Sequence, residues 1–256
     1  MSLLMTIRKA AKNPAAAARE LYHRLPKSAT EIKNSYYYIK YRFTSQSYTE
    51  FYKNLQNRKI REGYAYDWDS DVGIAQFEFL KRNGLSPEDE LLDIGCGNLR
   101  GGIHSIRYLQ PSNYHGIDIS EEAIKAGKEI LREEELLNQK EPNLLVNNNL
   151  MFEELKDETF DYIFAQSVFT HLPKEEISEC FEHVSAIMNQ ESVFFASVHI
   201  GEENIAVPSL SIESSDDYSY TMETFRDLGT QYGLEVCQVA YPEHPLDMDM
   251  IKIELR

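Results

Sequence analysis

Cysteine is scarce in this 256-residue chain, which has three: Cys96, Cys180 and Cys237. They lie far apart and form neither the close pairs of a thiolate metal site nor a redox C-x-x-C motif. This spacing excludes a disulfide-stapled secreted domain and a thiol-ligated metal centre. We therefore expect reduced thiols, a cytoplasmic location and no bound metal.

Long apolar runs are also missing. No uncharged apolar stretch approaches the roughly 20 residues of a membrane span. The first residues, M-S-L-L-M-T-I-R-K-A-A-K, lack the continuous apolar run of a secretory signal. Hydrophobic residues make up 42% of the chain and charged residues 27%, which describes a globular chain with a real core. We expect a soluble protein with one large domain and an appendage.

Positive charge is in short supply outside the N-terminal region. Residues 1–60 hold 12 Lys and Arg against 3 Asp and Glu, a net charge of +9, whereas the remaining residues carry −25. A body this acidic repels nucleic acid over most of its surface, so we do not expect a nucleic-acid partner. The basic segment suits phosphate, an anionic membrane or the acidic body of its own chain. Peripheral membrane contact through residues 1–26 stays open.

Residues 1–65 are predicted to form a basic, Tyr-rich helical appendage. Apolar side chains such as Ile32 and Tyr36 recur at helical spacing among Lys and Arg. Ser47 and Glu50 fit a capping box at the start of another helix. Such a segment can dock on an acceptor, a membrane surface or RNA, but packing against the body is the favoured interpretation.

From residue 66 to the C-terminus, apolar strands alternate with amphipathic helices. We predict strands at Glu90–Ile94, Tyr114–Asp118, Leu144–Asn148, Phe160–Gln166, Ser192–His199, Leu234–Ala240 and Met248–Leu255. We predict helices over about 70–84, 100–110, 120–137, 174–189 and 223–232. This alternation is typical of an α/β doubly wound, mostly parallel sheet with helices on both faces. Residues 66–256 are therefore expected to form one domain.

The most informative segment is L-L-D-I-G-C-G-N-L-R-G-G, residues 91–102. A buried strand ends at Gly95, where glycine lets the backbone approach a ligand closely, and a helix follows. The N–H groups at that helix start favour a carboxylate or another anion. Asp118, at the end of the next strand and 21 residues after Gly97, is placed to accept both ribose hydroxyls of an adenosine.

Two classes of enzyme build such a turn. A nicotinamide dehydrogenase usually begins close to its first strand, follows G-x-G-x-x-G and faces a pyrophosphate. Here the turn is G-C-G-N-L-R-G, and Asp93 precedes it. An acid at that place opposes a pyrophosphate but suits the ammonium of S-adenosylmethionine (SAM). The pattern favours SAM over hydride transfer.

Residues 70–256 resemble the class I SAM-dependent methyltransferases. L-D-I-G-C-G is among the family's most specific short signatures, and L-R-G-G after it resembles a bacterial-type subgroup. F-D-Y-I-F-A-Q-S-V-F-T-H-L, residues 160–172, is similar to the fourth-strand motif. The resemblance implies a seven-stranded Rossmann-like sheet, a closing antiparallel hairpin, and SAM as the cofactor.

The resemblance also assigns residues to that cofactor. Gly95, Cys96 and Gly97 are expected against SAM, Asp93 at its amino group, Asp118 on the ribose, Ile119 over the adenine and Gln166 beside the methionine end. The family often carries an acid after strand three, where this chain has V-N-N-N-L. Asn148 or Asn149 is expected to offer the adenine a neutral oxygen instead, with Leu150 as an apolar contact. Arg100 binds either the SAM carboxylate or an acid outside the site.

His171 is the only histidine beside a predicted cofactor-binding strand end, so it is the candidate general base. A structural role, in which it orients its loop, is the expected one. The predicted function is methyl transfer to a small-molecule or sugar hydroxyl, with the segment from about residue 28 closing the acceptor pocket. Alternatives are methylation of a protein, lipid or nucleic acid, and a non-catalytic SAM sensor or scaffold. The oligomeric state stays open.

Overall fold

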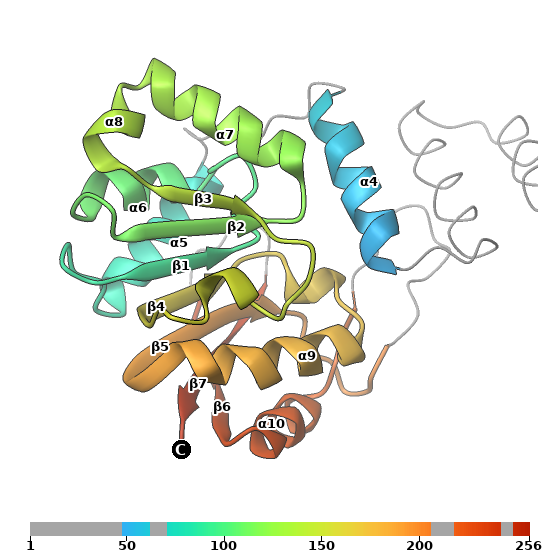
Figure 1. The fold of residues 1–256 in the computed structure, drawn as a ribbon. Coiled ribbons are helices and arrows are strands. Elements are labelled where there is room, and N and C mark those ends of the chain that lie inside the picture. The colour runs from blue at the N-terminus through green and yellow to red at the C-terminus, as the bar shows by residue number, and fades with distance from the viewer. Residues whose placement is uncertain (1–47, 62–70, 206–217, 242–247) are drawn as a thin grey trace, which may run out of the picture.

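The computed structural model describes residues 48–61, 71–205, 218–241 and 248–256. The predictions for residues 1–47 and the predicted domain boundary after residue 65 lie outside the described residues. Within them the chain forms a seven-stranded sheet with helices on both sides, in the order β3-β2-β1-β4-β5-β7-β6 (Figure 1). The predicted α/β, mostly parallel architecture is confirmed.

The strands follow the predicted order along the chain. They are β1 (Leu91–Ile94), β2 (Tyr114–Asp118), β3 (Asn143–Val146), β4 (Phe160–Ala165), β5 (Met188–Val198), β6 (Leu234–Val239) and β7 (Asp249–Leu255). The first five pair in parallel. β7 lies between β5 and β6 and runs antiparallel to both, which confirms the predicted closing hairpin.

Two of the described helices precede the first strand, and the others connect the strands. They are α4 (Tyr48–Arg61), α5 (Asp71–Arg82), α6 (Gly102–Tyr108), α7 (Glu121–Glu133), α8 (Leu136–Lys140), α9 (Lys174–Val184) and α10 (Met222–Gln231). Short 3-10 turns lie at Glu153–Leu155, Phe169–His171 and Ser185–Ile187. No helix of the described part has both the length and the apolar character that crossing a bilayer demands.

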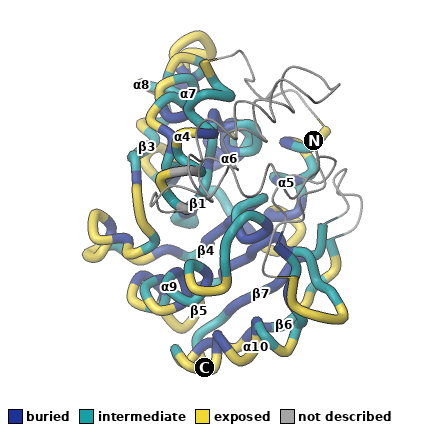
Figure 2. Tube along the Cα trace, turned by 90° about the vertical axis from the view of Figure 1, so that its right-hand side faces the viewer, coloured by how far each residue is buried: buried dark blue, intermediate teal, exposed yellow. Residues whose placement is uncertain are grey.

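Two apolar cores cover the two faces of the sheet. Leu91 and Phe195 point into the core under α5, α6 and α7, whereas their neighbours Leu92 and Phe194 point into the core under α9 and α10. Because side chains alternate along a strand, a sheet covered on both faces is buried along its whole middle (Figure 2). This burial on both faces explains why the central strands carry apolar residues at successive positions.

The helix predicted over 120–137 is confirmed over Glu121–Glu133 and is wrong only in its last four residues. α7 ends at Glu133, and Glu135 adopts a left-handed φ of 58° before α8 begins. A left-handed residue cannot continue a right-handed helix. The change of direction carries Leu136 into the core beneath α6 and α7.

The boundary between α9 and β5 also differs from the prediction. β5 begins at Met188, four residues before the predicted Ser192, and the helix predicted to 189 ends at Val184. The pairing of β4 with β5 shifts register here, and residues 189–191 are exposed and polar. The Ser192 hydroxyl donates to the Phe160 carbonyl at 2.6 Å and holds this bulge. The start of β5 was not predicted because residues 189–191 lack the apolar pattern of a buried strand.

Candidate functional site

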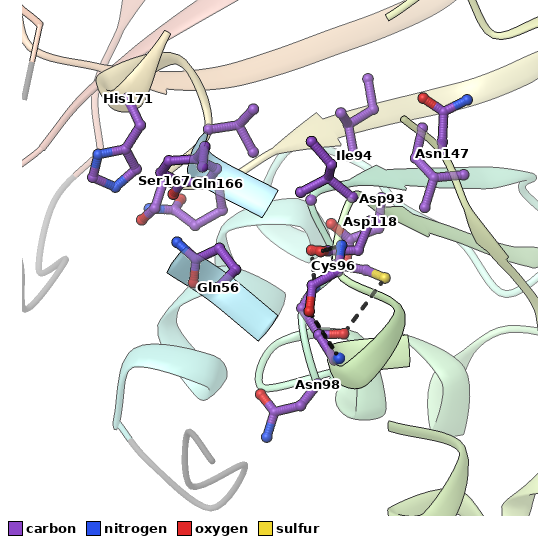
Figure 3. A pocket seen from close by; sticks show the side chains of 18 of the residues that line it. Gln56, Asp93, Ile94, Cys96, Asn98, Asp118, Asn147, Gln166, Ser167 and His171 are labelled. Carbon is purple, nitrogen blue, oxygen red and sulfur yellow. Dashed lines mark hydrogen bonds between the residues drawn. The ribbon is translucent and has the colours of Figure 1, made fainter. Parts of the chain in front are cut away.

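A pocket opens at the carboxyl ends of β1, β2 and β4, and α4 lies across it (Figure 3). Ligand sites of doubly wound sheets form at these strand ends. Every residue predicted for the site lines this pocket: Asp93, Gly95, Cys96, Gly97, Arg100, Asp118, Ile119, Asn148, Asn149, Leu150, Gln166 and His171. The fold thus gathers side chains from four separate loops.

The turn after β1 requires glycine for two different reasons. Gly95 has a φ of 74°, and a Cβ there would lie 2.4 Å from the side chain of Val168. Gly97 has a φ of 56°, and no protein atom lies within 4 Å of where its Cβ would stand. The first glycine is needed for packing. The second leaves the backbone open toward the pocket.

Asp118 is held by this same turn. Its Oδ2 accepts the Gly97 N–H at 2.9 Å, and its Oδ1 accepts the Ser120 N–H at 2.7 Å. Burial raises the pKa of Asp118, while the bonds from Ser120 and Gly97 act against that rise. Each carboxylate oxygen can accept a second hydrogen bond. Asp118 can therefore accept two ligand hydroxyls without leaving its partners.

Asp93, the third residue of β1, is buried more deeply than Asp118. Its Oδ2 accepts the Tyr114 hydroxyl at 2.6 Å. Burial raises the pKa of Asp93 to about 7, the Tyr114 hydrogen bond lowers it, and the nearby Asp118 carboxylate raises it. Because Asp93 also lines the pocket, a cationic ligand group placed there would favour its ionised form.

The three asparagines after β3 are engaged differently. The Asn148 Oδ1 accepts the Lys53 ammonium of α4 at 2.5 Å, whereas the Asn149 Oδ1 accepts the backbone N–H of Met151 at 3.0 Å. Asn147, which the sequence analysis did not select, is buried, lines the pocket and donates to Glu154 at 3.1 Å. This end of the pocket offers neutral amide groups rather than an acid.

The end of β4 is supported by the closing strands. The Gln166 Oε1 accepts the Tyr241 hydroxyl at 3.0 Å, and its Nε2 contacts Ser167 Oγ and Met248 Sδ, each at 3.3 Å. Ser167 has a φ of 55°, and its N–H donates to Ser197 Oγ at 2.7 Å. Left-handed non-glycine residues cost energy and cluster at functional sites. The network fixes Gln166 at the pocket wall.

His171 and Glu176 lie on the far side of the pocket from Asn147 (Figure 3 labels the histidine and the asparagine). The His171 ring is 5.6 Å from the ring of Tyr52, and a Glu176 oxygen accepts the Thr49 hydroxyl at 3.1 Å. Burial raises the pKa of Glu176, the Thr49 bond lowers it, and neighbouring glutamates raise it. An imidazole and a carboxyl group therefore share this end of the pocket.

α4 crosses the pocket and is anchored on its other side by α7. The Ser120 hydroxyl donates to the Asn57 Oδ1 at 2.8 Å, and the Glu122 N–H reaches the same oxygen at 3.3 Å. Arg61 pairs with the Glu122 carboxylate at 2.9 Å. Together with the Thr49 and Tyr52 contacts, these bonds hold α4 across the pocket, from the end beside Asp118 to the end beside His171.

Several lining residues were not predicted. They are Thr49, Tyr52, Gln56, Lys59, Ile60, Gln76, Ile94, Asn98, Gly101, Ile117, Ser120, Ala123, Asn147, Ser167, Val168, Leu172 and Glu176. A capping signal indicated the helix that carries the first five, but docking of that helix depends on contacts distant in sequence. Among the described residues no group of three His, Cys, Asp or Glu side chains is arranged to hold a metal ion.

The comparisons with known proteins point in one direction. Residues 92–194 match the family model described as a methyltransferase domain. Phosphoethanolamine N-methyltransferase 2 of Caenorhabditis elegans is 28% identical over 120 residues, which are 44% of this chain and 26% of that protein. The chain thus spans about a quarter of the length of this curated relative.

Solved structures share the fold over more of the chain. Magnesium protoporphyrin IX methyltransferase from Synechocystis PCC 6803, with bound SAM, aligns over 83% of this chain and 99% of its own, with a TM-score of 0.62 and 14% identity. A SAM-dependent methyltransferase from Clostridium acetobutylicum ATCC 824 aligns over 80% and 97%, with a TM-score of 0.54 and 13% identity. The glycopeptide N-methyltransferase MtfA aligns over 74% and 93%, with a TM-score of 0.56 and 14% identity.

At these identities the structural likeness concerns the fold. The chain has the Rossmann-like fold that these methyltransferases share, and residues 92–194 match the methyltransferase-domain model.

Proposed function

We propose that this protein binds SAM in the pocket and transfers its methyl group to a small-molecule acceptor. The observation that carries the proposal is that two carboxylates, Asp93 and Asp118, line the pocket beside the glycine turn at residues 95–97. Asp118 is preset to accept hydroxyls, and Asp93 lines the same pocket beside it. A pyrophosphate in this place would face two carboxylates, whereas a nucleoside joined to an amino acid meets groups that suit both halves.

The donor set fits SAM along the whole pocket. Asp118 suits the ribose hydroxyls, while Ile119 and Leu150 suit the two faces of an adenine. For the adenine amino group we favour Asn148 or Asn149, each of which carries a neutral oxygen. Asp93 and Arg100 suit the ammonium and the carboxylate of the amino-acid end. Gln166 and the turn residue Cys96 then border the methionine chain.

Methyl transfer asks little acid–base chemistry of the protein. SAM supplies a methyl group activated by its sulfonium, which passes to an acceptor lone pair as the C–S bond breaks and the acceptor gives up a proton. The chain has to align the acceptor and exclude water. We propose that α4 and the rest of the N-terminal appendage act as the lid, which the contacts of Asn57 and Thr49 at the two ends of α4 support.

The acceptor is proposed to enter at the end that holds His171, and a small-molecule or sugar hydroxyl is preferred. The relatives named for phosphoethanolamine, magnesium protoporphyrin IX and a glycopeptide support a small acceptor. A hydroxyl needs a base near its proton, and His171 or Glu176 can take that role. An amine acceptor needs only to arrive neutral.

Two measurements test the proposal. Calorimetric titration with SAM, S-adenosylhomocysteine and NAD should give binding of the first two only, and binding of NAD alone would contradict the proposal. Radiolabelled methyl transfer into fractionated cell extract should place the label in the small-molecule fraction. Label in protein, lipid or nucleic acid would move the acceptor to that class. Tight binding without any transfer would identify a SAM sensor instead.

A further inference from the structure

We propose that Tyr114 is a positioning residue of the cofactor site, whose hydroxyl keeps the Asp93 carboxylate ionised and turned toward the ammonium group of the ligand. The inference rests on the proposed function, because it requires a ligand with an amino-acid end. Tyr114 itself lies behind the pocket wall and is not among the lining residues.

The contact between the two side chains is short and sheltered. The Tyr114 hydroxyl donates to the Asp93 Oδ2 at 2.6 Å, a length within the range of hydroxyl–carboxylate bonds. Tyr114 is 2% exposed and Asp93 is 9% exposed. Hydrogen bonds to ionised groups are stronger than neutral ones, and exclusion of water strengthens them further. The phenol therefore acts on the charge state of Asp93, and also on its orientation.

Two glycines leave room for this contact. Gly116 is the direct strand partner of Asp93, and a Cβ there would lie 3.0 Å from the Tyr114 ring. A Cβ on Gly102, at the start of α6, would lie 2.2 Å from the Tyr114 hydroxyl oxygen. A larger residue at position 102 would collide with the phenol, and one at position 116 would crowd its ring and the Leu144 side chain. The position of the hydroxyl is thus specified by β1, β2 and α6 together.

The electrostatic surroundings make this hydrogen bond matter. Burial raises the pKa of Asp93 to about 7, and the Tyr114 bond opposes that rise. Burial also raises the pKa of Tyr114, so the phenol stays a donor. The groups that face Asp93 are Tyr114 and Asp118 from β2, the buried thiol of Cys96 and the apolar Phe164 of β4. The other titratable or charged groups that line its pocket are Arg100 ahead of α6, Lys59 from α4, and His171 and Glu176 at the far end.

A defined pH dependence follows. An ammonium binds the ionised form of Asp93, so affinity for S-adenosylhomocysteine should rise as the pH rises toward about 7. It should then level off, because the α-amino group of S-adenosylhomocysteine, like that of other free amino acids, stays protonated through neutral pH. Without the Tyr114 hydroxyl, the acidic limb should move to higher pH by about 1 pH unit, which lowers affinity at pH 6 by about tenfold.

The test is calorimetric titration of the full chain and of Tyr114→Phe with S-adenosylhomocysteine between about pH 5.5 and pH 8, a range that spans the ionisation of Asp93. Tyr108→Phe is the matched control, because its hydroxyl donates to the Leu85 carbonyl at 3.2 Å, away from Asp93. 5′-Methylthioadenosine is the matched ligand, because it lacks the amino-acid end. We expect the shifted limb only for Tyr114→Phe with S-adenosylhomocysteine.

Other outcomes overturn the inference in distinguishable ways. Equal weakening of both ligands at every pH would mean that the hydroxyl serves packing alone. A second cycle in an Asp93→Asn background guards against a simple folding defect, since Tyr114→Phe should there leave the pH profile unchanged. An equal shift in both backgrounds contradicts the proposal. If the unmodified chain binds no S-adenosylhomocysteine, the proposed function itself fails, and this inference with it.

Discussion

At the scale of single residues, the two acids of the pocket are prepared for a ligand by different means. Asp118 is held by the backbone N–H groups of Gly97 and Ser120, which belong to the turn itself. Asp93 is held by a side chain from the neighbouring strand, in a deeper and drier place. Substitution of the first should therefore act on affinity at every pH. Effects at the second should depend on pH.

Asp118→Ala should weaken binding of S-adenosylhomocysteine at least tenfold while the chain stays folded. Hydrogen bonds to a charged acceptor are each worth about 1.5–3 kcal/mol, and about 1.4 kcal/mol is a factor of ten in affinity. Asp89→Ala is the control, because Asp89 also accepts a backbone N–H, that of Ser86 at 2.7 Å, and is not part of the pocket lining. Unchanged affinity in a folded Asp118→Ala protein would remove this residue from the site.

His171→Ala should lower the thermal midpoint and the cofactor affinity together. The ring of His171 packs beside Tyr52 of α4, and an aromatic contact of this kind is worth about 0.5–1.5 kcal/mol. The expected loss of affinity is therefore about two- to tenfold. Turnover that falls by about 10²–10⁴ with stability and binding intact would instead identify a general base.

At the scale of elements, α4 is the segment that joins the two ends of the pocket. It contacts α7 through Asn57 and Arg61, and it contacts the far end through Thr49 and Tyr52. Leu55 anchors it in one of the two cores. A helix attached mainly at polar points can open with limited loss of buried apolar area.

Asn57→Ala should loosen α4 at its α7 end. The change removes an acceptor for two hydrogen bonds, each worth about 1 kcal/mol, so affinity for S-adenosylhomocysteine should fall by about fivefold or more. Cleavage by trypsin after Lys53 or Lys59 should become faster and should be slowed by ligand. Asn54→Ala is the control within the same helix, because Asn54 is exposed. Equal behaviour of the two variants would show that docking of α4 does not contribute to binding.

At the scale of the whole molecule, charge is divided along the chain. The total is −16, although residues 1–60 contribute +9. α4 carries positive charge to the body: Lys53, within residues 1–60, donates to the Asn148 amide, and Arg61, just beyond them, pairs with Glu122. The ion pair of Arg61 with Glu122 is one described case of attraction between the predicted basic appendage, residues 1–65, and the acidic body.

The full chain should therefore bind neither duplex DNA nor single-stranded RNA. Phosphate binding depends on local positive charge and weakens steeply between about 50 and 200 mM salt. Gel-shift titration across that range should give no retarded complex, and a vesicle-flotation assay with anionic lipid should be run beside it. A salt-sensitive shift with RNA would assign the basic segment a nucleic-acid role that its surroundings do not predict.

Much of the site could be predicted because its signals are local. A strand, a glycine turn and an acid at the next strand end are written within residues 91–118, and parallel strand ends must meet at one sheet edge. The break at Glu135 and the bulge before Ser192 could not be predicted, because left-handed and bulged residues there are imposed by packing. The polar lining contributed by α4 was missed because docking of α4 depends on contacts between residues far apart in the sequence.

The sequence by itself determined the strand order along the chain, the glycine turn and the identity of the two acids, since period and spacing encode these directly. Only the tertiary structure decided which groups act on those acids. Tyr114 is separated from Asp93 by 21 residues and reaches it from the neighbouring strand, where Gly102 and Gly116 leave room for the phenol. Asn57 reaches Ser120 across 63 residues. Contacts between residues so far apart in the sequence depend on how strands and helices pack, and no local sequence pattern predicts them.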